Sequence, residues 1–368
     1  MILTPVRIRS ALALIVVLLA YPIARSGEEG LGWKPADAGK YLDDRQTVWF
    51  EHADCVSCHT VLPYALARPA LRRIVGAEMR TQQEEKLLAR VRLRAANWKK
   101  LDTDAFGLYY DDSEQKKKES WGTEAVLNAV VLAFDDCSQG VSSPSEGVKQ
   151  AFSNLWHTQV RVGDDNGSWD WLNFNMGPWE EKESRYFGAA LAAIAVGTSP
   201  GYHTLVSFPD ADADADLGLT LLKDYLKAGF RTQNLHNQTW ALWAATKVEG
   251  ILTPAERKTV IDELLAKRQD DGGWNTTSLG KWTRSDGTPR ETASDGYATG
   301  LVLYVLQEAG VPREDRIIAG GLAWLKRNQT ASGAWRSVSV VKKRDPAAHS
   351  GKFMSDAATA FAVLALSR

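Results

Sequence analysis

The chain has 368 residues, of which 44% are hydrophobic and 24% are charged, and its formal net charge is −1. This composition is typical of an ordinary globular protein. No basic stripe stands out, so we expect no nucleic-acid partner. Three cysteines are too few for a disulfide scaffold.

Residues 1–26 have the pattern of an export signal. Arg7 and Arg9 precede an apolar run at 11–20, and the run is followed by small residues around Ser26. The run is shorter than a membrane span requires. We expect a secretory signal peptide, with an uncleaved N-terminal anchor as the alternative. The body is then periplasmic or otherwise exported, and it meets a membrane only through this segment if the segment is uncleaved.

Cys55, Cys58 and His59 form a Cys-x-x-Cys-His motif. This pattern is typical of c-type haem attachment, in which both thiols form thioethers and the imidazole binds the iron. With the Cys and His frequencies of this chain, only about 4 × 10⁻⁴ copies are expected by chance. We therefore predict one covalent haem c. The alternative is a buried or disulfide-forming cysteine pair, with the histidine near a helix cap.

A repeat follows the motif: a small polar residue, then an apolar helix rich in small residues. The copies begin at Ser120, Ser184, Asn237, Ser294 and Ser355. Ser and Asn suit helix N-caps, and a helix that is apolar on most faces is a buried one. A sixth helix of the same kind follows Ser57, inside the haem motif.

Amphipathic segments alternate with these helices, and we expect them to form an outer layer. They are Thr81–Leu101, Ala255–Arg268 and Pro312–Asn328. Six pairs of an outer and an inner helix fit residues 34–368. The pattern predicts an all-α fold, a single (α/α)6 toroid in which a double ring of helices surrounds a central apolar cavity, with the haem motif at 55–59 in its first unit.

One stretch has a spacing of aromatic, glutamine and glycine residues that identifies a family. Gly320–Trp335 places Gln329, Gly333 and Trp335 after a Trp-Leu pair, and shorter or looser copies end at Trp274 and Trp169. Tyr41–Gln46 keeps only the front half. The stretch resembles the QW repeat of squalene–hopene cyclases and related terpenoid-cyclase and prenyltransferase toroids, over roughly residues 34–368. The resemblance implies this fold, with Gln bonding free backbone groups and Trp covering turns, and not a particular chemistry.

The catalytic elements of those families are not matched. In place of the Asp-x-Asp-Asp element of cyclases, Asp210–Asp216 alternates Asp with Ala. We interpret this run as a capping or solvated stretch, with a calcium site as the alternative. The late helix starts carry Asp295 and Asp356 without a cysteine, so we expect no zinc. The Trp-rich loop at 167–179 would suit a sugar-binding enzyme, or QW-type packing.

Polar residues at the inner-helix starts are candidates for a catalytic or ligand-facing rim, or else they cap helices. They are Glu124, Arg185, Tyr186, His236, Asp295, Tyr297 and Asp356.

For the distal haem ligand we favour Met354 over His349, because the segment 347–354 precedes the sixth inner helix, which a closed ring brings beside the first. An open, five-coordinate iron is equally allowed.

The predicted function is redox chemistry or electron transfer, with a redox partner protein and a hydrophobic, isoprenoid-like ligand. The alternatives are a terpenoid cyclase-like or carbohydrate-active enzyme without haem, and a non-catalytic binding module. Whether the chain is an enzyme stays open.

Overall fold

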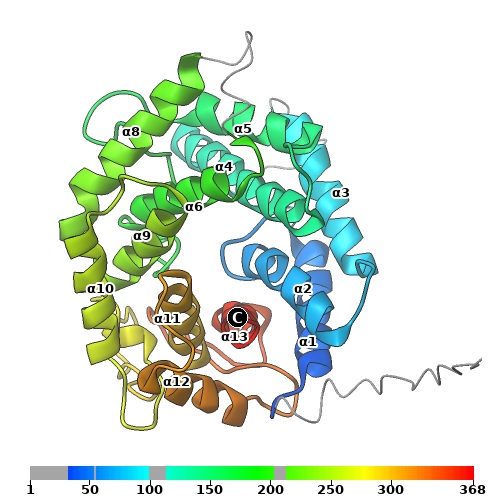
Figure 1. Ribbon diagram of the computed structural model, residues 1–368, viewed down its shortest axis with the longest axis vertical. Coiled ribbons are helices and arrows are strands. Elements are labelled where there is room, and N and C mark those ends of the chain that lie inside the picture. The colour runs from blue at the N-terminus through cyan, green and yellow to red at the C-terminus, as the bar shows by residue number, and fades with distance from the viewer. Residues whose placement is uncertain (1–31, 54, 99–112, 203–212) are drawn as a thin grey trace, which may run out of the picture.

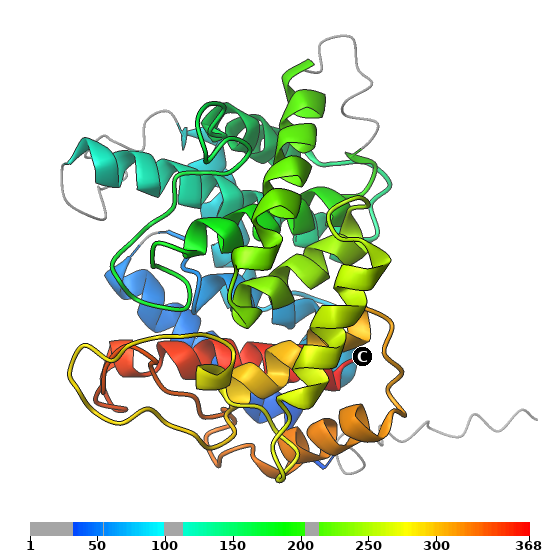
Figure 2. The ribbon, with the colours of Figure 1, turned by 90° about the vertical axis from the view of Figure 1, so that its left-hand side faces the viewer.

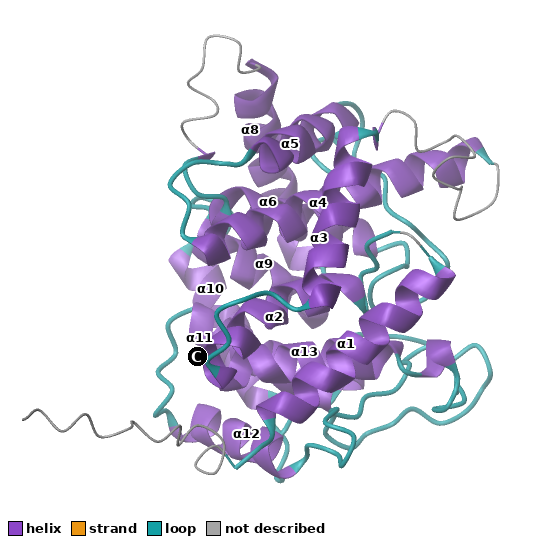
Figure 3. Cartoon of the chain, turned by 90° about the vertical axis from the view of Figure 1, so that its right-hand side faces the viewer, coloured by secondary structure: helices purple, strands orange, loops and turns teal. Residues whose placement is uncertain are grey.

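The computed structural model describes residues 32–53, 55–98, 113–202 and 213–368. Within these ranges the regular structure is helical, and the only β pairing is three isolated bridges (Figure 3). The predicted all-α fold class is confirmed. The expected export signal and Asp210–Asp212 lie outside the described residues. No helix in the described part is long and apolar enough to cross a membrane.

Six helices form an inner layer around a common centre (Figure 1). They are α2 (Val61–Val75), α4 (Glu114–Gln139), α6 (Ser184–Thr198), α9 (Leu235–Lys247), α11 (Gly296–Glu308) and α13 (Phe353–Leu366). Each contacts the next along the chain, and α13 returns to contact α2. The first and last of these helices therefore lie side by side, as we expected for the helices that follow Ser57 and Ser355.

The other six described helices lie outside this layer. They are α1 (Pro35–His52), α3 (Gln82–Ala96), α5 (Glu146–Thr158), α8 (Ala213–Gly229), α10 (Pro254–Ala266) and α12 (Arg316–Arg327). Each packs on at least one inner helix, such as α5 on α4 and α10 on α9. The long segments 267–295 and 328–352 gather at one end of the molecule (Figure 2), where Ser285 N donates to Val341 O at 2.8 Å.

The predicted start of α6 at Ser184 is confirmed, whereas three other predicted starts differ from the structure by one to seven residues. The structure places the N-caps of α4, α9 and α11 at Ser113, Asn234 and Asp295, rather than at Ser120, Asn237 and Ser294. The start of α4 shifts most, because Glu, Gln and Lys are good helix formers and carry the helix back across 114–119. At α13 the residue before the helix, Lys352, makes no side-chain cap.

Aromatic rings occupy the middle of the inner layer, where we expected an apolar cavity. Trp240 of α9 meets Phe361 of α13 with ring centroids 5.6 Å apart, and Phe134 of α4 meets Trp243 of α9 at 6.1 Å. Both pairs join helices that are not neighbours in the cyclic order. Large aromatic side chains are long enough to pack across the ring, so at this level the centre is a packed core.

The tryptophans of the QW-like copies share one contact. Each indole Nε1 donates to a carbonyl in the last turns of the preceding outer helix, at 2.7, 2.7 and 2.8 Å, and all three rings are fully buried. The pairs are Trp169 with Leu155, Trp274 with Leu264, and Trp335 with Leu325. The predicted role of the indole, covering a turn at a helix end, matches this geometry.

Gln329 links the last unit to the first through side-chain hydrogen bonds. Its side-chain oxygen accepts from Lys34 N at 2.7 Å, and its amide donates to the carbonyl oxygens of Lys34 and Gly333, both at 2.9 Å. Gln46, in the half-copy before the haem motif, behaves differently. It is 1% exposed, and neither of its side-chain atoms has a hydrogen-bond partner in the described part of the chain.

Candidate functional site

The two cysteines of the Cys-x-x-Cys-His motif lie between α1 and α2. Both are free thiols, and Cys55 and Cys58 are 7% and 3% exposed. Burial raises the pKa of Cys55 to about 12 and shifts the pKa of Cys58 in the same direction. Trp49 Nε1 donates to Cys55 O at 2.8 Å. The thiols are therefore protonated and shielded from solvent.

A serine between the cysteines fixes the turn that leads into α2. The Ser57 hydroxyl oxygen accepts from Thr60 N at 3.3 Å and Val61 N at 3.1 Å, and the Ser57 carbonyl accepts from Leu62 N at 2.9 Å. These bonds satisfy backbone N–H groups at the start of the helix. They also hold His59 in one position relative to α2.

The imidazole of His59 has a defined tautomer. Its Nδ1 lies 2.9 Å from Thr60 Oγ1, and that hydroxyl lies 2.7 Å from Asp356 Oδ2. An ionised carboxylate only accepts, so Thr60 donates to Asp356 and accepts from His59 Nδ1–H. Nε2 therefore carries the lone pair, an assignment that follows from the hydrogen-bond network. Burial lowers the pKa of His59, which keeps the ring neutral.

Asp356 is the centre of this network. Its carboxylate accepts from Arg45 Nε at 2.7 Å, Arg45 Nη2 at 2.9 Å, Tyr41 OH at 2.8 Å and Thr60 Oγ1 at 2.7 Å. Burial raises the pKa of Asp356, whereas the Arg45 guanidinium lowers it. Four donors fill the acceptor positions of an ionised carboxylate, so we assign the charged form.

Sequence reasoning missed Tyr41, Arg45 and Thr60. Tyr41 and Arg45 are four residues apart on α1 and share one helix face, but that spacing is common and does not single them out. Thr60 was hidden because its partner, Asp356, lies 296 residues away.

Aromatic rings enclose His59, which is 6% exposed. Phe353 stacks on it with centroids 3.7 Å apart and planes at 14°, and Trp49 meets it edge-on at 5.0 Å. Trp179 lies 6.2 Å away. The imidazole is thus held in a rigid, largely apolar setting, which further disfavours its protonation.

His349, the alternative distal ligand, has the opposite tautomer. Arg45 Nη1 lies 3.3 Å from its Nδ1, and a guanidinium can only donate, so Nδ1 accepts. The proton of the neutral ring is then on Nε2, which is buried without a hydrogen-bond partner in the described part of the chain. Burial lowers the pKa of His349 to about 4. In this arrangement Nε2 is not available as a ligand.

Met354, the favoured distal ligand, lines a small cavity together with His59. The cavity has a volume of about 60 Å³, and its other lining residues include Met176, Trp179, Glu180, Arg344 and Phe353. Met354 is 4% exposed and is the second residue of α13. Met176 is 37% exposed, and Arg344 Nη2 lies 3.3 Å from its sulfur. The buried and uncommitted thioether is that of Met354.

Two of the rim candidates, His236 and Tyr297, form a separate buried chain. Trp179 Nε1 donates to Tyr297 OH at 2.9 Å, and Tyr297 OH lies 2.8 Å from His236 Nε2. Trp240 Nε1 also donates to His236 Nε2, at 3.3 Å, so this nitrogen is an acceptor and Tyr297 donates to it; both His236 and Tyr297 are fully buried. Burial lowers the pKa of His236 to about 4. Every polar atom of this chain has a partner, which fits a structural role.

The remaining rim candidates do not converge on one site. Glu124 pairs with Arg94 of α3, Arg185 with Asp170 at 2.9 Å, and Tyr186 OH donates to Leu226 O at 2.8 Å. Asp295 caps α11 and accepts from Thr276. Of the predicted rim, only Asp356 reaches the His59 network. The remaining candidates are bound by other partners, so the structure does not bring the predicted rim together at one place.

The Trp-rich loop at 167–179 is not an exposed platform for sugars. Its three indoles are 5% exposed or less, and each donates a hydrogen bond inside the protein. They are Trp169, Trp171 and Trp179. Of the two interpretations of this loop, its geometry fits QW-type packing and not a sugar-binding surface.

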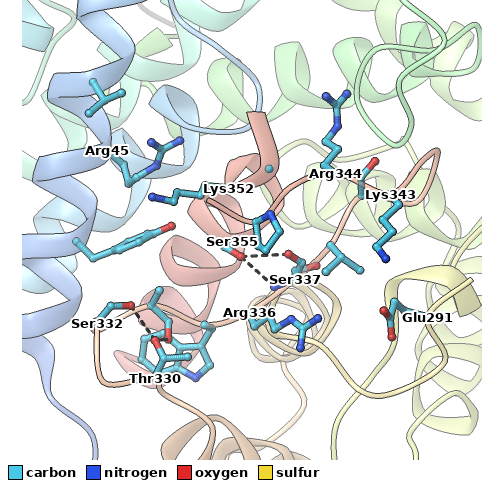
Figure 4. Close-up of a pocket in the computed structure, with 18 of the residues that line it drawn as sticks. Arg45, Glu291, Thr330, Ser332, Arg336, Ser337, Lys343, Arg344, Lys352 and Ser355 are labelled. Carbon is cyan, nitrogen blue, oxygen red and sulfur yellow. Dashed lines mark hydrogen bonds between the residues drawn. The ribbon is translucent and has the colours of Figure 1, made fainter. Parts of the chain in front are cut away.

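A second cavity, of about 620 Å³, lies where α1, the 330–344 segment and the start of α13 meet (Figure 4). Arg344 and Gly351 line both this cavity and the small one beside His59. Ser339 also lines both cavities, so the two spaces are adjacent.

In the part of the chain that the structure describes, no group of three or more His, Cys, Asp or Glu side chains could hold a metal ion. No protein-family model matches the sequence, and no curated protein is found as a relative.

Proposed function

We propose that this protein is an exported c-type haem protein that takes part in redox chemistry or electron transfer. Cys55 and Cys58 would hold the haem covalently and His59 would bind its iron. The observation that carries the proposal is the tautomer of His59. Thr60 Oγ1 accepts a hydrogen bond from His59 Nδ1–H, so the lone pair on Nε2 is free to bind a ligand. An imidazole bound to a metal usually donates its other N–H in this way.

The donor groups fit a haem. Two free thiols lie three residues apart, next to a neutral imidazole in the sequence, and a buried thioether lines the small cavity together with that imidazole. A bound haem would supply a centre that gains or loses one electron. Within the chain, Asp356 and Thr60 orient His59, while Trp49 and Phe353 exclude water from it. Met354 would complete the coordination, and a thioether favours a higher potential than a second imidazole.

The space beside His59 must enlarge to hold a haem. Its volume of about 60 Å³ is well below the 300 to 1,000 Å³ of ordinary small-molecule sites. The second cavity, of about 620 Å³, is of that size and shares Arg344 and Gly351 as lining residues. We infer that the segment 344–353, which includes Phe353, is displaced in the loaded protein and joins the two spaces.

Two further proposals rest on the sequence. The QW-like copies lead us to propose a relationship to the terpenoid-cyclase and prenyltransferase toroids, and with it a hydrophobic, isoprenoid-like ligand. A redox role requires a partner that supplies or accepts electrons, and we propose a partner protein. A cyclase-like enzyme or a non-catalytic binding module, each without haem, is the alternative function.

The test is expression of the full chain with c-type haem maturation factors, followed by visible spectra and haem staining after denaturation. We expect a Soret band and a mass gain that survives acid denaturation. Both should disappear in Cys55→Ala/Cys58→Ala. The matched control is Cys137→Ala, which removes an exposed thiol outside the motif and should leave both signals unchanged.

Absence of haem from the wild-type protein under these conditions would reject the proposal. So would an unchanged spectrum in the double variant. Circular dichroism of each variant separates loss of haem from loss of fold.

A further inference from the structure

Basic side chains predominate among the charged residues that line the cavity of about 620 Å³. Its basic lining residues are Arg45, Arg284, Arg336, Lys342, Lys343, Arg344 and Lys352, and its acidic ones are Asp44 and Glu291. Seven basic groups therefore face two acidic groups in a chain whose formal net charge is −1. Positive charge is concentrated at this one place.

Most of this charge is not neutralised within the protein. Arg45 pairs with Asp356 at 2.7 Å, and Arg284 lies 3.6 Å from Asp286. Asp44 pairs with Lys40 on its own helix. The other five basic side chains make no ion pair with any carboxylate in the described part of the chain, although Arg344 lies near enough to the buried Glu180 to lower the pKa of that carboxyl. Unpaired cations around a concave surface produce a positive potential that attracts anions.

The charges approach the cavity from different sides. Figure 4 shows Lys352 and Arg45 on one side, Lys343 and Arg344 on the opposite side, and Arg336 below them. The cavity also offers hydroxyl groups and an apolar wall that includes Trp335 and Val338. The volume suits an organic molecule of moderate size.

We infer that this cavity binds an organic anion that carries two or more carboxylate groups. Guanidinium groups match a carboxylate in a bidentate manner, and the lysines add point charges. The carboxylates have two possible sources. A free polycarboxylate is one. The two propionates of the haem are the other, because Arg344 lines both this cavity and the one beside His59. The second source rests on the proposed function.

The test is calorimetric titration of the full chain with citrate, and with triethyl citrate as its uncharged counterpart. The cavity variant is Arg336→Gln/Lys343→Gln/Lys352→Gln, at side chains that are at least partly exposed. The control variant is Lys86→Gln/Lys149→Gln/Lys258→Gln, which removes the same charge from exposed positions on α3, α5 and α10. Circular dichroism checks the fold of both.

We expect citrate to bind the wild-type chain and the control variant alike, and to bind the cavity variant about tenfold more weakly. Triethyl citrate should not bind, and added salt should weaken the binding of citrate. The inference fails if citrate does not bind the wild-type chain up to about 10 mM. It also fails if both variants lose the same affinity, since attraction by net charge then explains the binding.

The source of the carboxylates is distinguished by repeating the titration on haem-loaded protein and on Cys55→Ala/Cys58→Ala. Binding to the double variant but not to the loaded protein assigns the cavity to the propionates. Equal binding to both assigns it to a separate ligand. If haem never attaches, the citrate titration of the wild-type chain still stands, so the two proposals fail independently.

Discussion

Phe353 stacks on His59 with ring centroids 3.7 Å apart, although the two residues lie 294 positions apart in the sequence. The contact exists because α13 packs against α2, where the chain returns to its first inner helix. Phe353 thereby covers one face of the His59 imidazole. The Nε2 lone pair lies in the plane of the imidazole, so a ligand reaches this nitrogen along the edge of the stacked rings rather than through the Phe353 face.

Thiol labelling distinguishes the free and haem-bound states. In the haem-free native protein, we expect iodoacetamide at pH 8 to label Cys137 first, because it is exposed. Cys55 should react slowly, since it is buried and its pKa is raised to about 12. Denaturation should expose all three thiols, and mass spectrometry counts them. Haem-loaded protein should show a single reactive thiol even when denatured. Rapid labelling of all three thiols in the native protein would contradict the burial described.

Replacing Thr60 by Val should disturb His59 while keeping the side-chain shape. The change leaves Asp356 and His59 Nδ1 each short of one buried partner, which costs about 1–3 kcal/mol of unfolding free energy. In haem-loaded protein the reduction potential should also shift, because the imidazole loses the acceptor for Nδ1–H. Thr60→Ser keeps the hydroxyl and should restore the potential. A potential that is the same in all three proteins would remove Thr60 as a positioning residue.

Gln329→Met tests the join between the last and first units. The variant loses the hydrogen bonds to the backbone N and O atoms of Lys34, a residue 295 positions away. We expect the unfolding free energy to fall by about 1–2 kcal/mol, measured by urea denaturation. The matched control is Gln269→Met, whose bonds to Thr292 and Ser294 stay within one unit. If hydrogen exchange in α1 increases only in Gln329→Met, then Gln329 specifically holds the last unit against the first. Equal protection of α1 in both variants would argue against it.

His236 should titrate near pH 4 in the folded protein, because burial lowers its pKa to about 4. In the unfolded chain its pKa is near 6.5. The unfolded state therefore binds the proton more tightly, so this residue's stabilising contribution is complete above pH 6.5 and is lost as the pH falls towards 4. The loss is on the order of 3 kcal/mol. NMR of the His236 ring gives the folded pKa directly, and a value near 6.5 would contradict this burial. In His236→Gln, the unfolding free energy should lose this part of its pH dependence.

Local sequence signals determined the helical fold class and the roles of single residues. Trp335 and Trp274 contact carbonyls only ten residues before them, and such short-range contacts follow from spacing alone. The Cys-x-x-Cys-His pattern is likewise local, because its three residues lie within one short stretch of the chain. The positions of the caps of α9 and α11 were less certain, because several polar residues compete at each helix start.

Only the tertiary structure decided what surrounds the motif. Asp356 was predicted as a member of a wide rim, but it binds Arg45 and Thr60, 311 and 296 residues away. The basic cavity joins α1 to residues near the end of the chain in the same way. The sequence alone does not place such pairs, because their distance depends on how six helix pairs pack and turn. The direction of each side chain is set only by that packing.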